Sequence, residues 1–365
     1  MTIQSLLDVE DVRSAIDRVL AAAVDDLAEE LASFGADTAL VDELRGLVAG
    51  GKRLRAALCY WSWRANGGSQ TDDDARDVVL RVGGALELFQ AAALVHDDVM
   101  DASDTRRGRP AAHRHFAGLH EAQRWSGPAD LFGQAAAIVL GDLALIASER
   151  AFTDALEGAR TPHDEARAVF GRMRTEVIAG QYLDLVAQAQ PWAAPETEEA
   201  RARTVVRSKS ARYSVEHPLT LGAALAHAGP AALELCREVG LPLGEAFQLR
   251  DDLLGIFGDP TVTGKPAGDD LREGKRTVLI ARALAAADHD ERGRITESLG
   301  RRDLSVDDVE ALRHLLRRTG AVTAVEELID ELATPALARL RTSPLAEPGR
   351  TMLLELGRAS VNRVA

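Results

Sequence analysis

Two long apolar segments, Gly83–Met100 and Ala231–Phe257, constrain the fold of this 365-residue chain more than any other feature. Each has helical periodicity, is apolar along most of its length, and carries paired aspartates near its C-terminal end. A helix that is apolar on nearly every side is stable only when other elements surround it. The two segments therefore predict a helical protein in which two interior helices bring acidic ends to a site.

The rest of the chain also favours helices. Hydrophobic residues make up 46% of the sequence and aromatic residues only 4%, with alanine and leucine abundant and β-branched runs scarce. Further helices are expected at Val12–Phe34, Phe132–Glu157, Glu165–Gln188, Arg201–Ala226 and Lys275–Ala287, with others toward the C-terminus. Glycine and proline mark short loops, including Thr105–Pro110, and none is long enough to be a linker. We expect one all-α domain spanning residues 1–365.

Charge and cysteine content narrow the class of protein. The formal net charge is −14 and no basic patch is evident, which argues against a nucleic-acid partner. Cys59 and Cys236 lie far apart in apolar contexts, without metal-site or redox spacing, as buried thiols of a reducing compartment do. The acidic, amphipathic N-terminus resembles neither a signal nor a transit peptide, and no apolar run of membrane-spanning length is evident. We expect a cytoplasmic protein without an integral membrane segment.

The first acidic cluster lies in LVHDDVMDASDTRRGRP, Leu94 to Pro110. On a helix, Asp97 and Asp101 are one turn apart and about 40° apart in azimuth, so both carboxylates can face one point, with Asp98 beside them. Mg²⁺ prefers such oxygen ligands and completes its shell with water and substrate phosphate. This spacing predicts a magnesium site, and Asp104 falls outside it, where it caps the segment or pairs with the arginines.

The second cluster lies in FQLRDDLLGIFGDP, which contains Asp251 and Asp252. It is followed by TGKPAGDDLREGKR, which contains Lys265 and Lys275. One Asp-Asp pair at a helix end is more often a solvated surface feature. Two such pairs, each closing an apolar helix and each followed by basic residues, instead favour a site at a cavity mouth where Mg²⁺ ions bridge a diphosphate. The spacing of an EF-hand calcium loop is absent.

A third element is GGKRLRAAL, which places Gly51, Lys52, Arg53 and Arg55 at the head of an apolar segment. Backbone N–H groups at a helix N-terminus, together with basic side chains, form anion sites. The glycine spacing of a P-loop is absent. Taken alone, a solvated turn is an equally common reading of such a cluster.

Together these motifs resemble the trans-polyprenyl diphosphate synthases, the polyprenyl synthetase family that includes farnesyl and geranylgeranyl diphosphate synthases. The resemblance covers nearly the whole chain, and its elements come in the family's order: GGKRLR, LFQAAALVHDDVMD with DTRRGRP, LGD, AGQYLDL, RSKSA, FQLRDD and FGDPTVTGKPAGDDLREGKRT. It implies an isoprenoid-synthase helical bundle around a deep central apolar cavity, and a homodimer. It also implies a head-to-tail reaction of isopentenyl diphosphate with dimethylallyl, geranyl or farnesyl diphosphate.

The resemblance also implies roles for individual residues. The Mg²⁺ ligands are Asp97, Asp98, Asp101, Asp251 and Asp252, for three ions in all. The allylic diphosphate is bound by Arg106, Lys209 and Lys265, with Lys275 as a further substrate-binding cation. The isopentenyl diphosphate pocket is formed by Gly51, Lys52, Arg55, Arg107 and Gln90. Polar residues near the reacting carbons are Gln181, Ser210 and Gln248, and Asp184 matches an acid of the family. His96 is interpreted as a helix-packing residue.

One position departs from the family pattern. Many members have a third aspartate in the second motif, where this chain has Gly255. We expect weakened rather than abolished metal binding, and a catalytically weak or regulatory subunit of a heteromer remains an alternative. A class I terpene cyclase is disfavoured because the chain has the GKR of the isopentenyl site and lacks the cyclase's Asn/Ser/Glu metal motif.

Product length should depend on the residues below the metals. Ala92 and Ala93 precede Asp97 by about one helical turn, roughly 6–8 Å deeper, with Leu86 and Phe89 further down as a floor. Small alanines leave room for a longer tail than aromatic residues do, and one isoprene unit spans about 5 Å. We therefore expect a C20 product, geranylgeranyl diphosphate, and a shorter one in Ala92→Phe.

Overall fold

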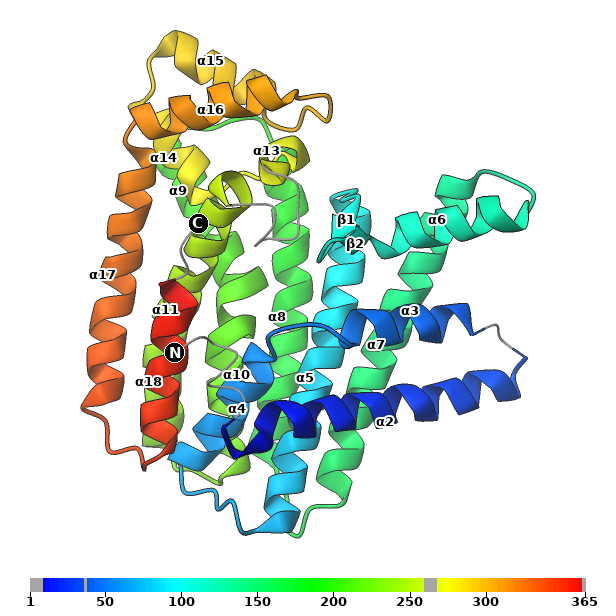
Figure 1. Cartoon of the computed structure of the whole chain (residues 1–365). Coiled ribbons are helices and arrows are strands. Elements are labelled where there is room, and N and C mark those ends of the chain that lie inside the picture. The colour runs from blue at the N-terminus through cyan, green and yellow to red at the C-terminus, as the bar shows by residue number, and fades with distance from the viewer. Residues whose placement is uncertain (1–8, 36–37, 259–267, 363–365) are drawn as a thin grey trace.

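The computed structural model describes residues 9–35, 38–258 and 268–362, and these ranges are almost entirely helical (Figure 1). This confirms the expected all-α fold. In the N-terminal half the elements are η1 Val9–Asp11, α2 Val12–Ser33, α3 Ala39–Val48, α4 Leu54–Ala65, α5 Asp73–Met100, β1 Thr105–Arg106, β2 Arg109–Pro110, α6 Ala112–Gln123 and α7 Ala129–Glu157. They continue as α8 Asp164–Ala189, α9 Pro195–Val205, η2 Val206–Glu216, α10 His217–Leu225 and α11 Pro230–Phe257. The C-terminal elements are α13 Asp269–Glu273, α14 Val278–Ala286, α15 His289–Ser298, α16 Val306–Arg318, α17 Ala321–Arg341 and α18 Gly349–Val361.

The two apolar segments are the interior helices α5 and α11, as expected. α5 begins earlier than the pattern indicated, at Asp73, because the Asp72 side chain accepts a hydrogen bond from Ala75 N (3.2 Å) and caps the helix. It packs against α2, α4 and α7, and α11 packs against η2, α10, α17 and α18. Figure 1 shows these long helices running side by side, with α2 and α3 lying across them and α15 and α16 at the far end.

The helix expected at Arg201–Ala226 is continuous but not uniform. Its middle part, η2, is π-helical, with i→i+5 hydrogen bonding and a wider cross-section than an α-helix. Two neighbouring helices approach η2 through glycines. A Cβ on Gly180 of α8 would lie 2.4 Å from Lys209 N, and one on Gly244 of α11 would lie 2.2 Å from Ala211 O. The wide π-helical segment therefore fits only because the facing residues on both neighbouring helices, Gly180 and Gly244, have no side chain.

The segment Thr105–Pro110, expected to be a loop, forms the small antiparallel hairpin of β1 and β2. Its two central residues, Arg107 (φ 54°) and Gly108 (φ 75°), both have positive φ, which is the pattern of a type I′ turn. This turn matches the twist of paired strands, so even two-residue strands can pair. Arg106 lies in β1 and Arg107 in the turn, so adjacent arginines take different backbone positions.

Two helices, α5 and α7, are long and apolar enough to cross a membrane, which differs from the expectation that no such run exists. Length and composition alone do not distinguish a membrane span from a core helix. The apolar window of α5 is 78% buried within the fold, as in a core helix, whereas that of α7 is only 39% buried. α7 therefore leaves an apolar face uncovered in this chain.

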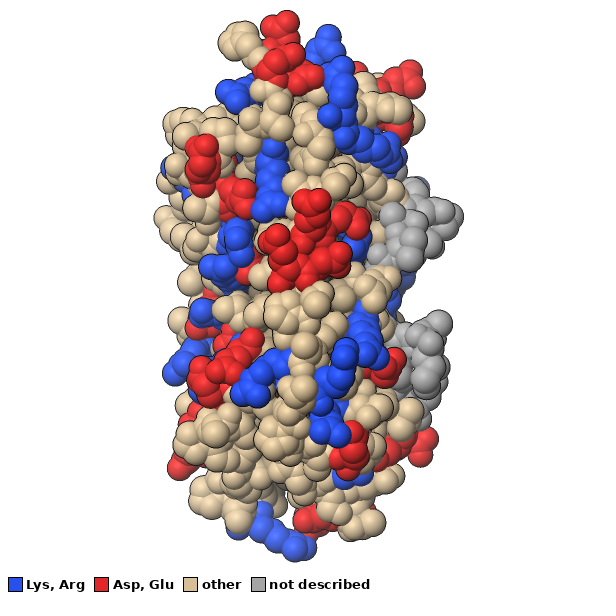
Figure 2. All heavy atoms as spheres, turned by 90° about the vertical axis from the view of Figure 1, so that its left-hand side faces the viewer, with Lys and Arg blue, Asp and Glu red and all other residues tan. Residues whose placement is uncertain are grey.

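Charged side chains are mixed on the molecular surface. Figure 2 shows lysine and arginine interspersed with aspartate and glutamate on the face it presents, with an acidic patch near its centre. With a net charge of −14, the chain cannot attract anions through its overall field. An anionic ligand must therefore be held by individually placed cations.

Candidate active site

A cavity of about 660 Å³ opens between α5, α8, η2 and α11. Most of the residues predicted as site residues line it: Lys52, Arg55, Gln90, Ala93, Asp97, Arg106, Gln181, Asp184, Lys209, Ser210, Gln248, Asp251, Asp252 and Lys275. Residues from seven separate parts of the chain thus meet at one cavity. Lys265 falls outside the described residues.

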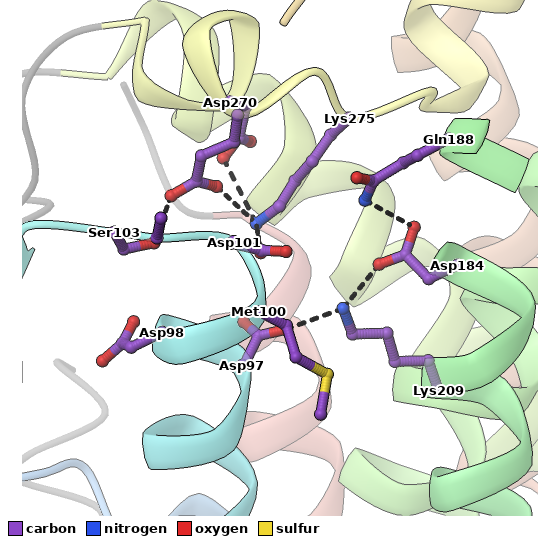
Figure 3. A network of polar contacts seen from close by, with 12 residues as sticks. Asp97, Asp98, Met100, Asp101, Ser103, Asp184, Gln188, Lys209, Asp270 and Lys275 are labelled. Carbon is purple, nitrogen blue, oxygen red and sulfur yellow. Dashed lines mark hydrogen bonds and ion pairs between the residues drawn. The ribbon is translucent and has the colours of Figure 1, made fainter. Parts of the chain in front are cut away.

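The three aspartates of the first cluster point in different directions. Asp97 faces the cavity and accepts hydrogen bonds from Lys209 Nζ (2.9 Å) and Gln181 Nε2 (3.2 Å). Asp98 is buried and accepts two hydrogen bonds from Arg106 Nε (3.0 and 3.1 Å). Asp101, at the C-cap of α5, lies 3.2 Å from Lys275 Nζ (Figure 3). Asp97 therefore lines the cavity, whereas Asp101 is buried outside its lining, so the two carboxylates do not face one point as expected.

Nearby cations change the acidity of this cluster. Burial would raise the pKa of Asp97, but Lys209, Lys275 and Arg106 together hold that pKa well below its usual range. Burial raises the pKa of Asp101 to about 6, against the attraction of Lys275. Among its neighbours, Asp97 raises the Asp101 pKa further. Asp97 is therefore an anion at neutral pH even in the empty cavity.

Lys209, on η2, bridges two helices. Its Nζ lies 2.9 Å from Asp97 on α5 and 2.6 Å from Asp184 on α8 (Figure 3). Burial alone would lower the pKa of Lys209, but Asp97 and Asp184 together raise that pKa above its usual range. Lys209 is thus a fixed cation beside the first cluster.

The paired arginines of the hairpin point in different directions, and only Arg106 lines the cavity. Arg106 turns toward Asp98 and the cavity, and its Nη2 also lies 3.8 Å from Asp97 Oδ2. Arg107 turns the other way, and its Nη1 donates hydrogen bonds to Leu47 O (3.1 Å) and Gly50 O (2.7 Å). The hairpin therefore fastens the first acidic cluster to the Gly50–Gly51 turn that precedes Lys52.

The environment of Arg55 contains residues that the sequence did not single out. Arg55 Nη2 donates to Ser214 Oγ (2.7 Å), and its guanidinium lies over the Tyr213 ring at 4.2 Å. Tyr213 in turn donates from its hydroxyl to Gln90 Oε1 (2.5 Å). Tyr213 follows Lys209 by four residues, and that helical spacing was the available signal. These contacts bring Arg55 and Gln90 of the predicted isopentenyl pocket together.

The second cluster is less compensated than the first. Gln248 Nε2 donates to Asp252 Oδ1 (2.8 Å) within α11. Burial, with Asp270 and Asp251 adding to it, raises the pKa of Asp252 to about 7, although the hydrogen bond from Gln248 lowers it. Lys275 Nζ lies 2.8 Å from Glu273 Oε2 and 3.7 Å from Asp270 Oδ1. Asp252 therefore has a neutral hydrogen-bond donor, whereas Asp97 and Asp98 have cations as donors.

The residues present fit divalent metal ions. In the part of the chain that the structure describes, no three acidic, histidine or cysteine side chains converge on one point as a closed metal site. Instead Asp97, Asp251 and Asp252 line one cavity, and the buried Asp101 Oδ2 makes an ion pair with Lys275 Nζ (3.2 Å) but no hydrogen bond. Separated carboxylates of this kind suit Mg²⁺ ions that complete their shells with water and diphosphate oxygens.

Below the charged region, α5 presents a different face from the one expected. Ala93 lines the cavity, whereas Ala92 and Phe89 are fully buried and lie outside its lining. The reason is azimuth: Ala92 lies five residues before Asp97, about 140° around the helix, whereas Ala93 lies about 40° away. Phe89 packs edge-on against Tyr213, with ring centroids 5.4 Å apart. The proposed length-determining positions therefore reduce to Ala93, with Phe89 supporting the wall.

Two other residues of the first motif lie outside the cavity lining. His96 Nε2 lies 3.2 Å from Ile138 O of α7, in keeping with the helix-packing interpretation. Asp104 accepts from Arg114 Nε (2.7 Å) and so pairs with an arginine other than the two in its motif. Asp104 therefore pairs with Arg114 of α6 and does not line the cavity.

Residues 38–316 match the profile of the polyprenyl synthetase family. The chain belongs to this family. A geranylgeranyl diphosphate synthase of Mycobacterium tuberculosis is 31% identical over 91% of the chain and 87% of that protein. A geranylfarnesyl diphosphate synthase of Aeropyrum pernix is 31% identical over 76% of the chain and 79% of its own length.

The comparison with solved structures indicates the same family as the comparison of sequences. A geranylgeranyl pyrophosphate synthase of Corynebacterium glutamicum, solved with isoprenyl diphosphate and magnesium, superposes with a TM-score of 0.92. It is 37% identical and covers 98% of the chain and 100% of its own. The expected fold and enzyme class, a trans-prenyltransferase, are thus confirmed, and the use of divalent metal is typical of the family.

Proposed function

We propose that this chain condenses isopentenyl diphosphate head-to-tail with an allylic diphosphate and that its main product is geranylgeranyl diphosphate. The observation that carries the proposal is the division of one cavity into a charged mouth, with Asp97, Lys209 and Asp251, and a lower part with Ala93 and Phe247 in its wall. We propose the single domain 1–365 as the active unit and the cytoplasm as its location.

The chain's own residues support each step. Lys209 and Arg106 lie beside Asp97, where they would hold the departing diphosphate of the allylic substrate. When bound, three Mg²⁺ ions on the two aspartate clusters would neutralise charge on that diphosphate. Apolar wall residues, including Val177, Phe247 and Leu254, exclude water from the carbocation. The proton is lost to the released diphosphate, so no histidine base is required.

The isopentenyl substrate would lie on the other side of Arg106. Lys52 and Arg55 line the cavity there, and Arg107 braces the turn that carries Lys52 through its bond to Gly50 O. Gln90 lies beside them, fixed by the Tyr213 hydroxyl. These cations are separate from the aspartates, which suits a diphosphate bound without metal.

The test is a product assay with the purified chain. With Mg²⁺ and isopentenyl diphosphate, we expect each of dimethylallyl, geranyl and farnesyl diphosphate to be extended and to end at one main C20 product by chromatography. No incorporation with any primer would favour the catalytically weak or regulatory subunit. A cyclic hydrocarbon released from the primer alone would favour the terpene cyclase.

The length of the prenyl product can be tested with a matched pair of variants. Ala93→Phe should shorten the main product by one or two isoprene units, because the new ring projects into the cavity below Asp97. Ala92→Phe is the control for position, since Ala92 is fully buried against the core and outside the lining. If both variants keep the wild-type product length, the assignment of this wall is wrong.

We further propose a homodimer that covers the open face of α7. Leu131, Ile138, Val139 and Ile146 of α7 are each at least 47% exposed and fall within about 100° of one another around the helix. An apolar stripe of this size favours association of two copies. Ile138→Glu with Ile146→Glu should give a monomer by light scattering, whereas binding of the wild-type chain to lipid vesicles instead of itself would contradict the proposal.

A further inference from the structure

The C-terminal end of α5, which carries the first aspartate cluster, closes in a turn that usually contains glycine. Ser103 N donates to Asp98 O (3.0 Å). Ala102 N donates to Val99 O (3.3 Å), and the two bonds together are the pattern of a Schellman motif. The residue in the left-handed conformation of this motif is Ala102, with φ 49°. Because a Cβ is strained at positive φ, other contacts must hold this turn.

Arg302 provides such a contact from the loop between α15 and α16. Its Nη1 donates to Ala102 O (2.8 Å) and its Nη2 donates to Asp101 O. The last carbonyls of a helix have no partner within the helix, so one guanidinium satisfies two of them. A cation at this position also interacts favourably with the negative end of the helix dipole. Arg302 thus joins the C-terminal part of the chain to the end of α5, although it lies 200 residues after Ala102.

The loop that carries Arg302 is itself fastened to α13. On one side of Arg302, Gly300 N donates to Leu271 O (2.9 Å). On the other side, Leu304 O accepts from Arg272 Nε (3.2 Å). Because the loop is held on both sides, the Arg302 side chain has a fixed base from which it holds the end of α5.

The turn at the end of α5 supports a cation of the cavity. Lys275 lines the cavity, and its Nζ lies 3.2 Å from Asp101 Oδ2 and 2.8 Å from Glu273 Oε2 (Figure 3). Glu273 in turn accepts a hydrogen bond from Ser103 Oγ. Asp101 and Ser103 flank Ala102, so both contacts depend on the backbone conformation of that residue.

We propose that Arg302 is a positioning residue for diphosphate binding. By holding the strained turn at Ala102, it keeps Asp101 and Lys275 in place beside the cavity. The inference rests on the proposed function, in which Lys275 is a substrate-binding cation. Arg302 does not itself line the cavity, so it acts through these residues. It lies on the surface, so its replacement should leave the core of the fold unchanged.

The test measures the binding of inorganic diphosphate in excess Mg²⁺ by calorimetry. Arg302→Ala should weaken this binding about tenfold, as loss of a supporting contact around a metal site does. In the prenyl transfer reaction, the KM for farnesyl diphosphate should rise about tenfold while kcat stays within about threefold. The double variant Ala102→Gly/Arg302→Ala should bind diphosphate within about threefold of wild type, because glycine adopts positive φ without strain.

Arg301→Ala is the matched control, because it removes the same charge from the adjacent residue, which pairs with Asp303 (3.0 Å). It should leave diphosphate binding within about twofold. Arg302→Lys keeps the charge without the planar fork and should lose about threefold, which gives the comparison if Arg302→Ala does not fold. The inference is overturned if Arg302→Ala, or Arg302→Lys in its place, binds diphosphate as the control does. It is also overturned if the double variant binds no better than Arg302→Ala. The calorimetry uses no isopentenyl diphosphate, so a failure of prenyl transfer would be seen separately, in the product assay.

Discussion

The two aspartate clusters differ in how the protein treats their charge. On α5, Asp97 and Asp98 each have a cation within hydrogen-bonding distance, Lys209 and Arg106. On α11, Asp252 has the neutral Gln248 as its hydrogen-bond donor, with Asp270 close by. Asp97 and Asp98 are held by cations before any metal binds, whereas Asp252 is buried beside other acids at a cost that a divalent cation would offset. Two similar Asp-Asp motifs in one chain therefore need not contribute to its stability in the same way.

The largest effect should come from the first cluster. Asp97→Asn should lower the rate of isopentenyl incorporation by about 10³-fold, because it removes a carboxylate that faces the cavity and also the partner that positions Lys209. The measurement is radiolabelled product formation at saturating substrates and Mg²⁺. Asp104→Asn is the control from the same motif, since Asp104 pairs with Arg114, and it should keep wild-type activity. More than a tenth of wild-type activity in Asp97→Asn would contradict the role.

The second cluster should respond differently to added metal. Asp252→Asn should lower activity by about 10²-fold at low Mg²⁺, and much of this loss should disappear as Mg²⁺ rises, because the cluster retains Asp251. The measurement is a Mg²⁺ titration of the rate for Asp252→Asn and Asp97→Asn in parallel. Equal recovery of both variants at high Mg²⁺ would remove the distinction between the clusters.

Metal binding should release protons from Asp101 of the first cluster and Asp252 of the second. With pKa values of about 6 for Asp101 and about 7 for Asp252, both groups are more protonated at pH 6 than at pH 8. Mg²⁺ requires the carboxylates, so its affinity in the presence of diphosphate should rise about tenfold over this range, with protons released. Calorimetry in buffers of different ionisation enthalpy measures the proton count. Asp252→Asn should reduce that count, and an unchanged count would contradict the assignment.

A further expected effect is on stability, and its sign should differ between Asp252 and Asp97. Asp252 has a raised folded-state pKa, so its burial destabilises the metal-free protein increasingly from about pH 4 to pH 7 and by a constant amount above that. Asp252→Asn should therefore stabilise the protein at pH 8, by up to about 4 kcal/mol. Asp97 has a lowered pKa, so its contribution is stabilising above its unfolded-state pKa, and Asp97→Asn should destabilise. Urea unfolding in EDTA at pH 5 and pH 8 measures both, and equal signs at pH 8 would contradict the comparison.

Much of this site could be predicted because its residues sit in ordered motifs on helices. The position of Asp97 at the cavity followed from the motif, and the cations near it followed from family order, but Asp101 lies at the C-cap of α5 and turns toward Lys275 instead of facing the same point. Ala92 was misplaced because a position in sequence was taken as depth without its angle around α5. Tyr213 was missed because its contacts to Arg55 and Gln90 join residues far apart in the chain. Arg302 was missed because it contacts the end of α5 from 200 residues away, and no local pattern records such a contact.

The π-helical segment η2 sets a limit on how this sequence can vary. Lys209 and Ser214, five residues apart, both line the cavity, as i→i+5 winding allows. Deleting one residue between them would favour ordinary α-winding and would turn everything that follows by about 100° around the axis. Ser214 and α10 would then face new neighbours, although no side chain of the site had been replaced. Within η2, the chain should accept many substitutions on the face that points away from the cavity. It should accept no insertion or deletion, so the number of residues in η2 is itself a functional property.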